Sequence, residues 1–257
     1  MKKKITKILK IKNRRPLVCL TAYSKPMAKI LDKYCDIVLV GDSLATAMYG
    51  MKNTHHVTLD TMIQHGISVS SNLSKALCVI DMPNKTYRNI KEAKKNAKLI
   101  ITKTGCDAVK MECNGKNLKI IESVVKSGIP VMGHIGFTPQ HYNKFKIQGL
   151  SEKERVKLIK EAKANERAGV FSIVIECVRD LVAKDITKSL KIPTIGIGSS
   201  KHCDGQILVT DDMLGLSGFY PRFIKKFARL NNIIEKGVQK YNKAVLTRKF
   251  PSKKHIF

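Results

Sequence analysis

The strongest limit on the fold of this chain is a repeated alternation of short apolar runs with longer amphipathic segments. The run Ile37-Val38-Leu39-Val40 is typical: it has no polar position, as expected of a strand buried on both faces of a parallel sheet. Comparable runs cover residues 16–22, 36–40, 77–81, 108–112, 130–136, 171–176, 193–198 and 205–209. Most are followed by a helical pattern, and the 257 residues suit a (β/α)₈ TIM barrel, an α/β fold.

The segments between the strands show helical spacing of apolar residues, with lysines on the opposite face. The expected helices cover residues 28–33, 59–69, 87–104, 116–127, 151–168, 180–190 and 221–246, and residues 44–58 are expected to form a loop. We predict a single barrel domain over 1–257, with a basic N-terminal extension and a frayed basic tail from about residue 247. A doubly wound sheet is the alternative, but no Gly-x-Gly-x-x-Gly motif follows the first strand.

The charge of the chain is strongly positive: 48 Lys and Arg against 20 Asp and Glu give a net charge of +28. A basic nucleic-acid-binding protein is therefore one alternative. However, the basic residues are spread along the chain, there is no Trp, and aromatic residues make up only 6%, which leaves few platforms for stacking bases. This pattern favours solvated lysine faces, whose field would attract anionic substrates.

The cysteines and the ends of the chain suggest a cytoplasmic protein. The seven cysteines include no Cys-x-x-Cys pair, and several lie in or beside apolar runs, as expected of reduced thiols. The basic start lacks the apolar region of a signal peptide. No run is long enough for a transmembrane helix, so no membrane partner is expected.

Polar side chains end the apolar runs one after another. In a parallel barrel the carboxyl ends of all strands converge on one mouth, so side chains distant in sequence become neighbours there. A carboxylate after a strand is, taken alone, more often a helix cap, and this alternative applies to Asp42. The residues in this position are Asp42, Asp81, Lys110 with Glu112, His134 and Glu176.

These residue types suit the chemistry of a 2-oxo acid. Carboxylates such as Asp42 and Asp81 are hard ligands that favour Mg²⁺, whereas Zn²⁺ is less suited because only His134 supplies a nitrogen. A bound Mg²⁺ could polarise the oxo acid, and Lys110 could neutralise its charge. Glu176 would remain as a base that removes a proton beside the carbonyl. The expected product of this step is a metal-stabilised enolate.

The same segments resemble ketopantoate hydroxymethyltransferase, the 3-methyl-2-oxobutanoate hydroxymethyltransferase family. They occur in the family's order and spacing from about residue 5 to residue 228. The matching stretches are Leu20-Thr21-Ala22-Tyr23, Val40-Gly41-Asp42-Ser43, Asp81-Met82-Pro83, Val109-Lys110-Met111-Glu112, Gly133-His134-Ile135-Gly136-Phe137-Thr138-Pro139-Gln140, Ile195-Gly196-Ile197-Gly198 and Cys203-Asp204-Gly205-Gln206. Of these, His-Ile-Gly-Phe-Thr-Pro-Gln and Cys-Asp-Gly-Gln are distinctive.

The resemblance implies a barrel of the phosphoenolpyruvate/pyruvate-binding type, assembled as a homodecamer. It also implies transfer of a hydroxymethyl group from the co-substrate 5,10-methylenetetrahydrofolate to 3-methyl-2-oxobutanoate. The product would be 2-dehydropantoate (ketopantoate), in the first committed step of the pantothenate pathway that leads to coenzyme A. The residues themselves point to the metal and the base, but not to the folate.

By the same resemblance, Asp42 and Asp81 ligate a Mg²⁺ ion in each subunit and contact the substrate bound to it. Glu112 completes the site directly or through water, and Mn²⁺ or Co²⁺ are alternatives to Mg²⁺. Ser43 and Lys110 bind the oxo acid. The remaining two roles are those of Glu176 as proton acceptor and His134 as a residue lining the substrate pocket.

Several positions depart from the family pattern while all the proposed site groups are intact. They are Ser24, Asn84, Cys113, Asn114, Ser199 and Ser200. They leave open a divergent member that acts on another 2-oxo acid. A Mg²⁺-dependent carbon–carbon lyase or mutase of the related barrels is a further alternative, because such enzymes also work on oxo-acid enolates.

Overall fold

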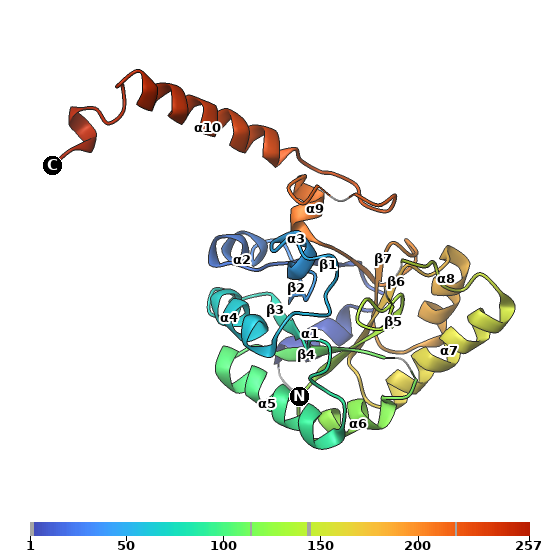
Figure 1. Ribbon diagram of the computed structural model, residues 1–257. Helices are drawn as coiled ribbons and strands as arrows, with labels where there is room; N and C mark the ends of the chain where they lie inside the picture. The colour runs from blue at the N-terminus through green and yellow to red at the C-terminus, as the bar shows by residue number, and fades with distance from the viewer. Residues whose placement is uncertain (1–2, 114, 143–144, 219) are drawn as a thin grey trace. The chain divides into compact units, whose positions relative to one another are not determined.

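Eight parallel strands close into a barrel in chain order in the computed structural model, which describes residues 3–113, 115–142, 145–218 and 220–257 (Figure 1). The strands are β1 (Leu17–Thr21), β2 (Ile37–Val40), β3 (Leu77–Asp81), β4 (Ala108–Glu112), β5 (Val131–Gly136), β6 (Ser172–Glu176), β7 (Thr194–Ile197) and β8 (Gly205–Leu208). Pairing of β1 with β8 closes the sheet. The predicted TIM barrel and all of its predicted strands are confirmed.

Helices between the strands cover the outside of the barrel (Figure 1). They are α2 (Lys25–Leu31), α4 (Leu59–Ser70), α5 (Ile90–Thr104), α6 (Leu118–Lys126), α7 (Glu152–Arg167) and α8 (Asp180–Ser189). N-cap side chains stabilise the first turns of α4, α5 and α7: Thr58, Asn89 and Ser151 each accept a hydrogen bond from a backbone N–H in the first turn. Their apolar faces and the outward side chains of the strands form one large core.

The basic start of the chain folds into a helix that closes one end of the barrel. In α1 (Lys3–Ile11), the isoleucines Ile5, Ile8 and Ile11 are buried and pack with the side chains that fill the barrel interior. Lys12 forms an ion pair with Asp204, immediately before β8, so the helix lies at the amino ends of the strands. Because the segment is so rich in lysine, its amphipathic pattern was not recognised in the sequence and no helix was predicted there.

Other differences from the prediction lie in segments with weak periodicity. A short helix, α3 (Leu44–Ala47), occupies the start of the expected loop, and α9 (Thr210–Leu214) follows β8. The helix expected over 221–246 is α10 (Leu230–Leu246), and residues 221–229 are irregular apart from a turn at residues 222–223 and a bend at residue 227. A short 3₁₀ helix (Lys253–His255) lies in the expected tail.

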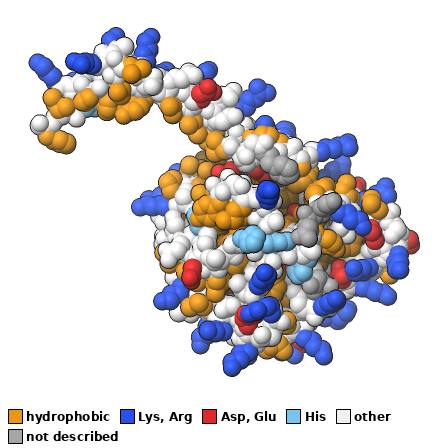
Figure 2. Space-filling model, viewed as in Figure 1, with side chains coloured by type: hydrophobic (Ala, Val, Ile, Leu, Met, Phe, Trp, Pro, Cys, Tyr) orange, Lys and Arg blue, Asp and Glu red, His pale blue; other side chains and the backbone are white. Residues whose placement is uncertain are grey.

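The chain divides after Val209 into two compact units, of which the first contains the whole barrel. A single domain over 1–257 stays a prediction. All seven cysteines are buried and unpaired. Among the described residues, no helix has an apolar stretch long enough to cross a bilayer. Lys and Arg side chains are spread over much of the visible face and interspersed with other types (Figure 2).

Candidate active site

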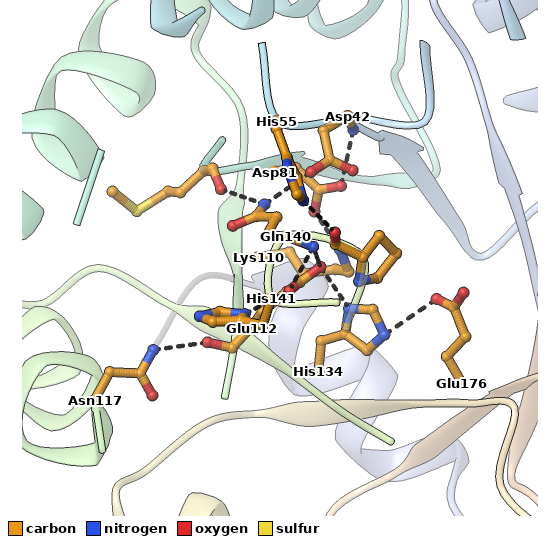
Figure 3. Close-up of polar contacts among 12 residues, drawn as sticks. Asp42, His55, Asp81, Lys110, Glu112, Asn117, His134, Gln140, His141 and Glu176 are labelled. Atoms are coloured by element: carbon orange, nitrogen blue, oxygen red, sulfur yellow. Dashed lines mark hydrogen bonds and ion pairs between the residues drawn. The ribbon is translucent and has the colours of Figure 1, made fainter. Parts of the chain in front are cut away.

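The polar side chains at the strand ends meet at one mouth of the barrel, as predicted (Figure 3). Asp81 and Lys110 are paired in the β3–β4 register, and Lys110 Nζ donates to Asp81 Oδ1 at 2.5 Å. The other oxygen, Asp81 Oδ2, accepts the backbone N–H of Asp42 at 3.0 Å. All three side chains are buried. The ends of β2, β3 and β4 are thus joined by direct polar contacts.

A second set of contacts continues across β4, β5 and β6. Glu112 and His134 are paired in the strand register, with His134 Nδ1 3.8 Å from Glu112 Oε1. On the other side of the ring, His134 Nε2 lies 3.1 Å from Glu176 Oε2. The ring is 2% exposed, and neither of its nitrogens has an aligned hydrogen-bond partner within the described residues. His134 is therefore a buried polar ring between two carboxylates with hydrogen-bonding capacity to spare.

The loop after β5 supplies Gln140, which joins the two sets and was given no role in the sequence analysis. Its amide Nε2 donates to Asp42 Oδ2 at 2.7 Å and to the carbonyl of Met82 at 3.0 Å. Its Oε1 accepts from the Tyr87 hydroxyl, and its backbone N–H donates to Glu112 Oε2 at 3.1 Å. Gln140 holds the carboxylates of β2 and β4 in one network. A role for Gln140 could have been predicted from its position at the end of the distinctive His-Ile-Gly-Phe-Thr-Pro-Gln stretch.

Three more residues at the mouth were not predicted from the sequence to belong to the site. His141 Nδ1 lies 2.9 Å from Glu112 Oε2, and Asn117 Nδ2 donates to the backbone carbonyl of Glu112 at 2.7 Å. His55, from the loop after β2, contacts the carbonyl of Pro139 through Nε2 at 2.9 Å. All of them belong to loops or helix starts, where neither strand nor helix periodicity places a side chain.

Asp42 and Ser43 lie beside each other at the end of β2, but their side chains have different partners. The Asp42 carboxylate accepts from Gln140, whereas the N-cap position of α3 belongs to Ser43, whose hydroxyl makes no cap bond. The helix-cap alternative for Asp42 is therefore wrong. Ser43 Oγ lies 2.9 Å from the hydroxyl of Tyr23, from the loop after β1.

Burial and crowding shape the electrostatics of the mouth. Burial, and then the negative charge of Asp81, raise the pKa of Asp42 well above its usual value, although Lys110 opposes this. Burial lowers the pKa of Lys110, but the nearby carboxylates Asp81, Asp42 and Glu112 outweigh it, so this pKa is raised. With every group ionised, three carboxylates would share one ammonium. In that state the cluster would carry an excess of negative charge that a divalent cation would offset.

The donor set at the mouth fits a hard cation. Asp42 and Asp81 offer carboxylate oxygens on adjacent strand ends, and Mg²⁺ is usually held by one or two carboxylates together with water or substrate oxygens. In the part of the chain that the structure describes, no three Asp, Glu, His or Cys side chains surround one point as a closed ligand set. Glu112 is engaged by the backbone of Gln140 and by His141.

Five of the six departures from the family pattern lie in segments that follow the carboxyl ends of strands. Ser24 precedes α2 without a side-chain cap bond, and Cys113 is buried. Ser199 Oγ donates to the carbonyl of Val178, and Ser200 Oγ donates to Asp180. Asn84 lines a pocket beside the mouth. Asn114 lies outside the described residues.

The chain matches a family model over nearly its whole length. Residues 2–253 match the model described as ketopantoate hydroxymethyltransferase. A 3-methyl-2-oxobutanoate hydroxymethyltransferase from Pelagibacter ubique (strain HTCC1062) is 50% identical over 257 residues, which covers 100% of both chains.

Solved structures with the same barrel come from enzymes of other activities. The crystal structure of 2,3-dimethylmalate lyase, a PEP mutase/isocitrate lyase superfamily member, aligns with a TM-score of 0.59 at 13% identity, covering 100% of this chain and 93% of the lyase. Phosphonopyruvate hydrolase in complex with oxalate and Mg²⁺ aligns with a TM-score of 0.60 at 14% identity, covering 98% of this chain and 93% of the hydrolase. At such low identity the likeness establishes the fold alone, which is the predicted (β/α)₈ barrel.

Proposed function

This chain belongs to the ketopantoate hydroxymethyltransferase family, and we propose on that basis that it transfers a hydroxymethyl group to 3-methyl-2-oxobutanoate. The donor is 5,10-methylenetetrahydrofolate and the product is ketopantoate, a precursor in the pantothenate pathway. The observation that carries the proposal is full-length similarity to named relatives in a chain whose predicted site residues meet at the barrel mouth. Water supplies the hydroxyl oxygen, so that the methylene unit ends as a hydroxymethyl group.

Asp42 and Asp81 would hold Mg²⁺, with Glu112 as a direct or water-mediated ligand. The support is the excess of buried carboxylates over cations and the fit of carboxylate oxygens to a hard ion. When bound, Mg²⁺ supplies Lewis-acid polarisation of the 2-oxo group. The phosphonopyruvate hydrolase structure, with Mg²⁺ and oxalate, is consistent with a metal site in this type of barrel.

The substrate carboxylate would lie between Ser43 and Lys110. Lys110 stays protonated because carboxylates surround it, and its ion pair with Asp81 fixes the direction of the ammonium. Ser43 is fixed by the hydroxyl of Tyr23. These contacts bind and orient a small anion without any movement of the strands, which favours a defined reactive geometry.

Glu176 would accept the proton from C3 of the oxo acid. Its carboxylate reaches the mouth from the end of β6, where Oε2 lies 3.1 Å from Nε2 of the His134 ring. The proton moves to a Glu176 oxygen. The C3 carbon then forms the new carbon–carbon bond with the one-carbon unit, whose two carbon–nitrogen bonds to the folate break. Water supplies the hydroxyl oxygen, and the folate leaves as tetrahydrofolate with protons on the two freed nitrogens. His134, with unused hydrogen-bonding capacity, would line the substrate pocket.

Proton exchange in D₂O tests the first half of this reaction without any folate. We expect Mg²⁺-dependent exchange at C3 of 3-methyl-2-oxobutanoate, followed by NMR. Glu176→Gln should slow exchange by about a hundred-fold or more, the usual contribution of a general base, while Mg²⁺ binding stays near normal. Glu122→Gln, on the exposed side of α6, is the control. Unchanged exchange in Glu176→Gln would remove this residue from the role.

The other hypotheses are less favoured. A lyase or mutase shares the fold with this chain, but the relative at 50% identity is named as a transferase. A divergent member that uses another 2-oxo acid is tested by comparing kcat/KM for branched and unbranched 2-oxo acids. A nucleic-acid-binding protein rests only on the net charge, and binding that disappears at physiological salt would reject it.

We further propose a cytoplasmic homo-oligomer, a decamer by the family resemblance. In the second unit, α10 has no buried residue and exposes several apolar side chains: Ile233, Ile234, Val238, Tyr241, Val245 and Leu246. Such an amphipathic helix is typical of an element that packs in an assembly. Light scattering coupled to size exclusion should give a mass several times 28.8 kDa.

A further inference from the structure

His65, on α4, lies between two tyrosines that follow the first two strands of the barrel. Its Nδ1 is 2.6 Å from the backbone carbonyl oxygen of Tyr23, and its Nε2 is 2.7 Å from the hydroxyl of Tyr49. A carbonyl oxygen only accepts hydrogen bonds, so Nδ1 carries the proton and donates to Tyr23. In the neutral ring Nε2 is then the acceptor, and the Tyr49 hydroxyl donates to it. Both ring nitrogens are used, which fixes the tautomer and the orientation of the ring.

The ring of His65 also packs against both tyrosine rings. Its centroid lies 6.5 Å from that of Tyr23, at an interplanar angle of 85°, and 5.9 Å from that of Tyr49, at 62°. Edge-to-face contacts of this kind are favourable. Tyr23 is buried, His65 is half-buried and Tyr49 is exposed. The three rings therefore form a cluster that leads from the surface to the buried side chain of Tyr23.

Two side chains of α4 hold the loop between β1 and α2. His65 binds the carbonyl of Tyr23, and three residues further along the helix Ser68 Oγ accepts the backbone N–H of Lys25 at 3.1 Å. Ser24, between them, occupies the N-cap position of α2 but makes no cap bond with its side chain. The loop thus receives bonds from α4 on both sides of a position that lacks the usual side-chain cap.

The buried end of the cluster meets the proposed substrate site. The Tyr23 hydroxyl lies 2.9 Å from Ser43 Oγ, and either oxygen is able to donate. A substrate carboxylate only accepts hydrogen bonds, so the Ser43 hydroxyl has to donate its single proton to it. The Ser43 oxygen must then accept from Tyr23. A bound carboxylate therefore requires one direction of donation, from Tyr23 to Ser43 and from Ser43 to the ligand.

We propose that His65 is a positioning residue for the carboxylate of the oxo acid and acts through Tyr23 and Ser43. The inference rests on the proposed function, in which Ser43 binds this carboxylate. His65 fixes the backbone and the ring of Tyr23, Tyr23 donates to Ser43, and the Ser43 proton then points to the carboxylate. The carboxylate keeps this contact before and during the reaction, so His65 should affect binding of the acid and not the chemical step.

Proton exchange at C3 of 3-methyl-2-oxobutanoate in D₂O with Mg²⁺, followed by NMR, gives KM and kcat for each variant. Tyr23→Phe removes only the donor hydroxyl, and His65→Leu removes the donor to the loop. We expect each to raise KM about two- to ten-fold at unchanged kcat, the range for one neutral hydrogen bond. His65→Asn, whose amide N–H can replace Nδ1–H, should restore KM. Calorimetric titration with the oxo acid should show the same changes in Kd without turnover.

The Ser43→Ala background separates positioning from a loss of packing. Without the hydroxyl there is nothing for Tyr23 to orient, so neither Tyr23→Phe nor His65→Leu should raise Kd further. A merely structural role of His65 would raise Kd by the same factor in both backgrounds. Tyr34→Phe is the control: this exposed tyrosine lies just before β2, at the opposite end of the barrel, and the variant should keep the wild-type KM.

The outcomes distinguish this inference from the proposed function. An unchanged KM in His65→Leu, a change in kcat alone, no rescue by His65→Asn, or equal factors in the two backgrounds would overturn the inference. Exchange by wild-type protein would leave the proposed function standing in each of these cases.

If wild-type protein neither binds nor exchanges the oxo acid, the proposed function fails. Urea unfolding then tests the orientation of Ser43 through Tyr23 by itself. A smaller midpoint shift for Tyr23→Phe in the Ser43→Ala background than in wild-type protein would support it. Shifts that add would overturn it.

Discussion

Replacing Gln140 by alanine should destabilise the barrel far more than the loss of one loop side chain usually does. The substitution removes the donor to the buried Asp42 carboxylate and leaves the buried Tyr87 hydroxyl without its acceptor. A hydrogen bond to a charged group contributes about 1.5–3 kcal/mol, and a buried group left unsatisfied costs about 1–3 kcal/mol. Together these terms predict a loss of about 2.5–6 kcal/mol in the free energy of unfolding. The backbone contact of Gln140 with Glu112 would remain.

Urea unfolding at fixed protein concentration, followed by circular dichroism, measures this loss. In a thermal scan, at about 2–4 °C per kcal/mol for a chain of this size, the melting temperature should fall by about 5–24 °C. Gln206→Ala is the matched control, because Gln206 makes a single side-chain hydrogen bond, to the carbonyl of Ser200 at 2.8 Å, and should cost about 1 kcal/mol. A loss below about 1 kcal/mol in Gln140→Ala would refute the claim that Gln140 holds the carboxylates in place.

Three further predictions concern parts of the fold that support the site. Burial opposes ionisation of Asp32, but hydrogen bonds from the backbone of Ala76 and from Ser74 lower its pKa to about 2. This stabilisation is present above the ordinary carboxylate pKa and is lost as pH falls through about 2. Between pH 5 and pH 2, the free energy of unfolding of wild-type protein should therefore fall by about 1 kcal/mol more than that of Asp32→Asn, after allowance for solvent screening. Urea titrations at the two pH values measure this difference. Gly136→Ala should lower the free energy of unfolding by more than about 2 kcal/mol, because at φ +92° a Cβ would clash with the Glu176 carbonyl. Gly50→Ala is the control: a Cβ there has free space, so only the positive φ opposes it, and the loss in the same titration should be about 1 kcal/mol. Ile8→Ala in α1 should cost about 2–5 kcal/mol by calorimetry, and the exposed Lys10→Ala near zero; equal effects would contradict burial of Ile8.

The strands were predictable because their apolar sequences fit only one kind of structure. A run such as Ile37–Val40 has no polar position, so it fits only a strand covered on both faces. The same logic placed Asp81 and Lys110 in one mouth, since parallel strands all end on the same side of the barrel.

The parts that were not predicted depend on tertiary contacts. α1 has isoleucines at helical spacing, but only the barrel interior explains why a segment so rich in lysine is ordered. Gln140 and His141 lie in a loop, and their partners, Asp42 and Glu112, are brought near them only by closure of the sheet. Periodicity along the chain carries no information about such pairs.

Because α1 closes the amino end of the barrel, the structure restricts where the two reactants of the proposed reaction could enter. Because Ile5, Ile8 and Ile11 fill that end, both reactants would share the opening at the carboxyl ends of the strands. The small oxo acid would sit deeper, between Ser43 and Lys110, and the bulky folate would lie above it. The kinetic scheme should therefore be sequential and ordered, with the oxo acid first on and its product last off, and product inhibition patterns would reveal that order.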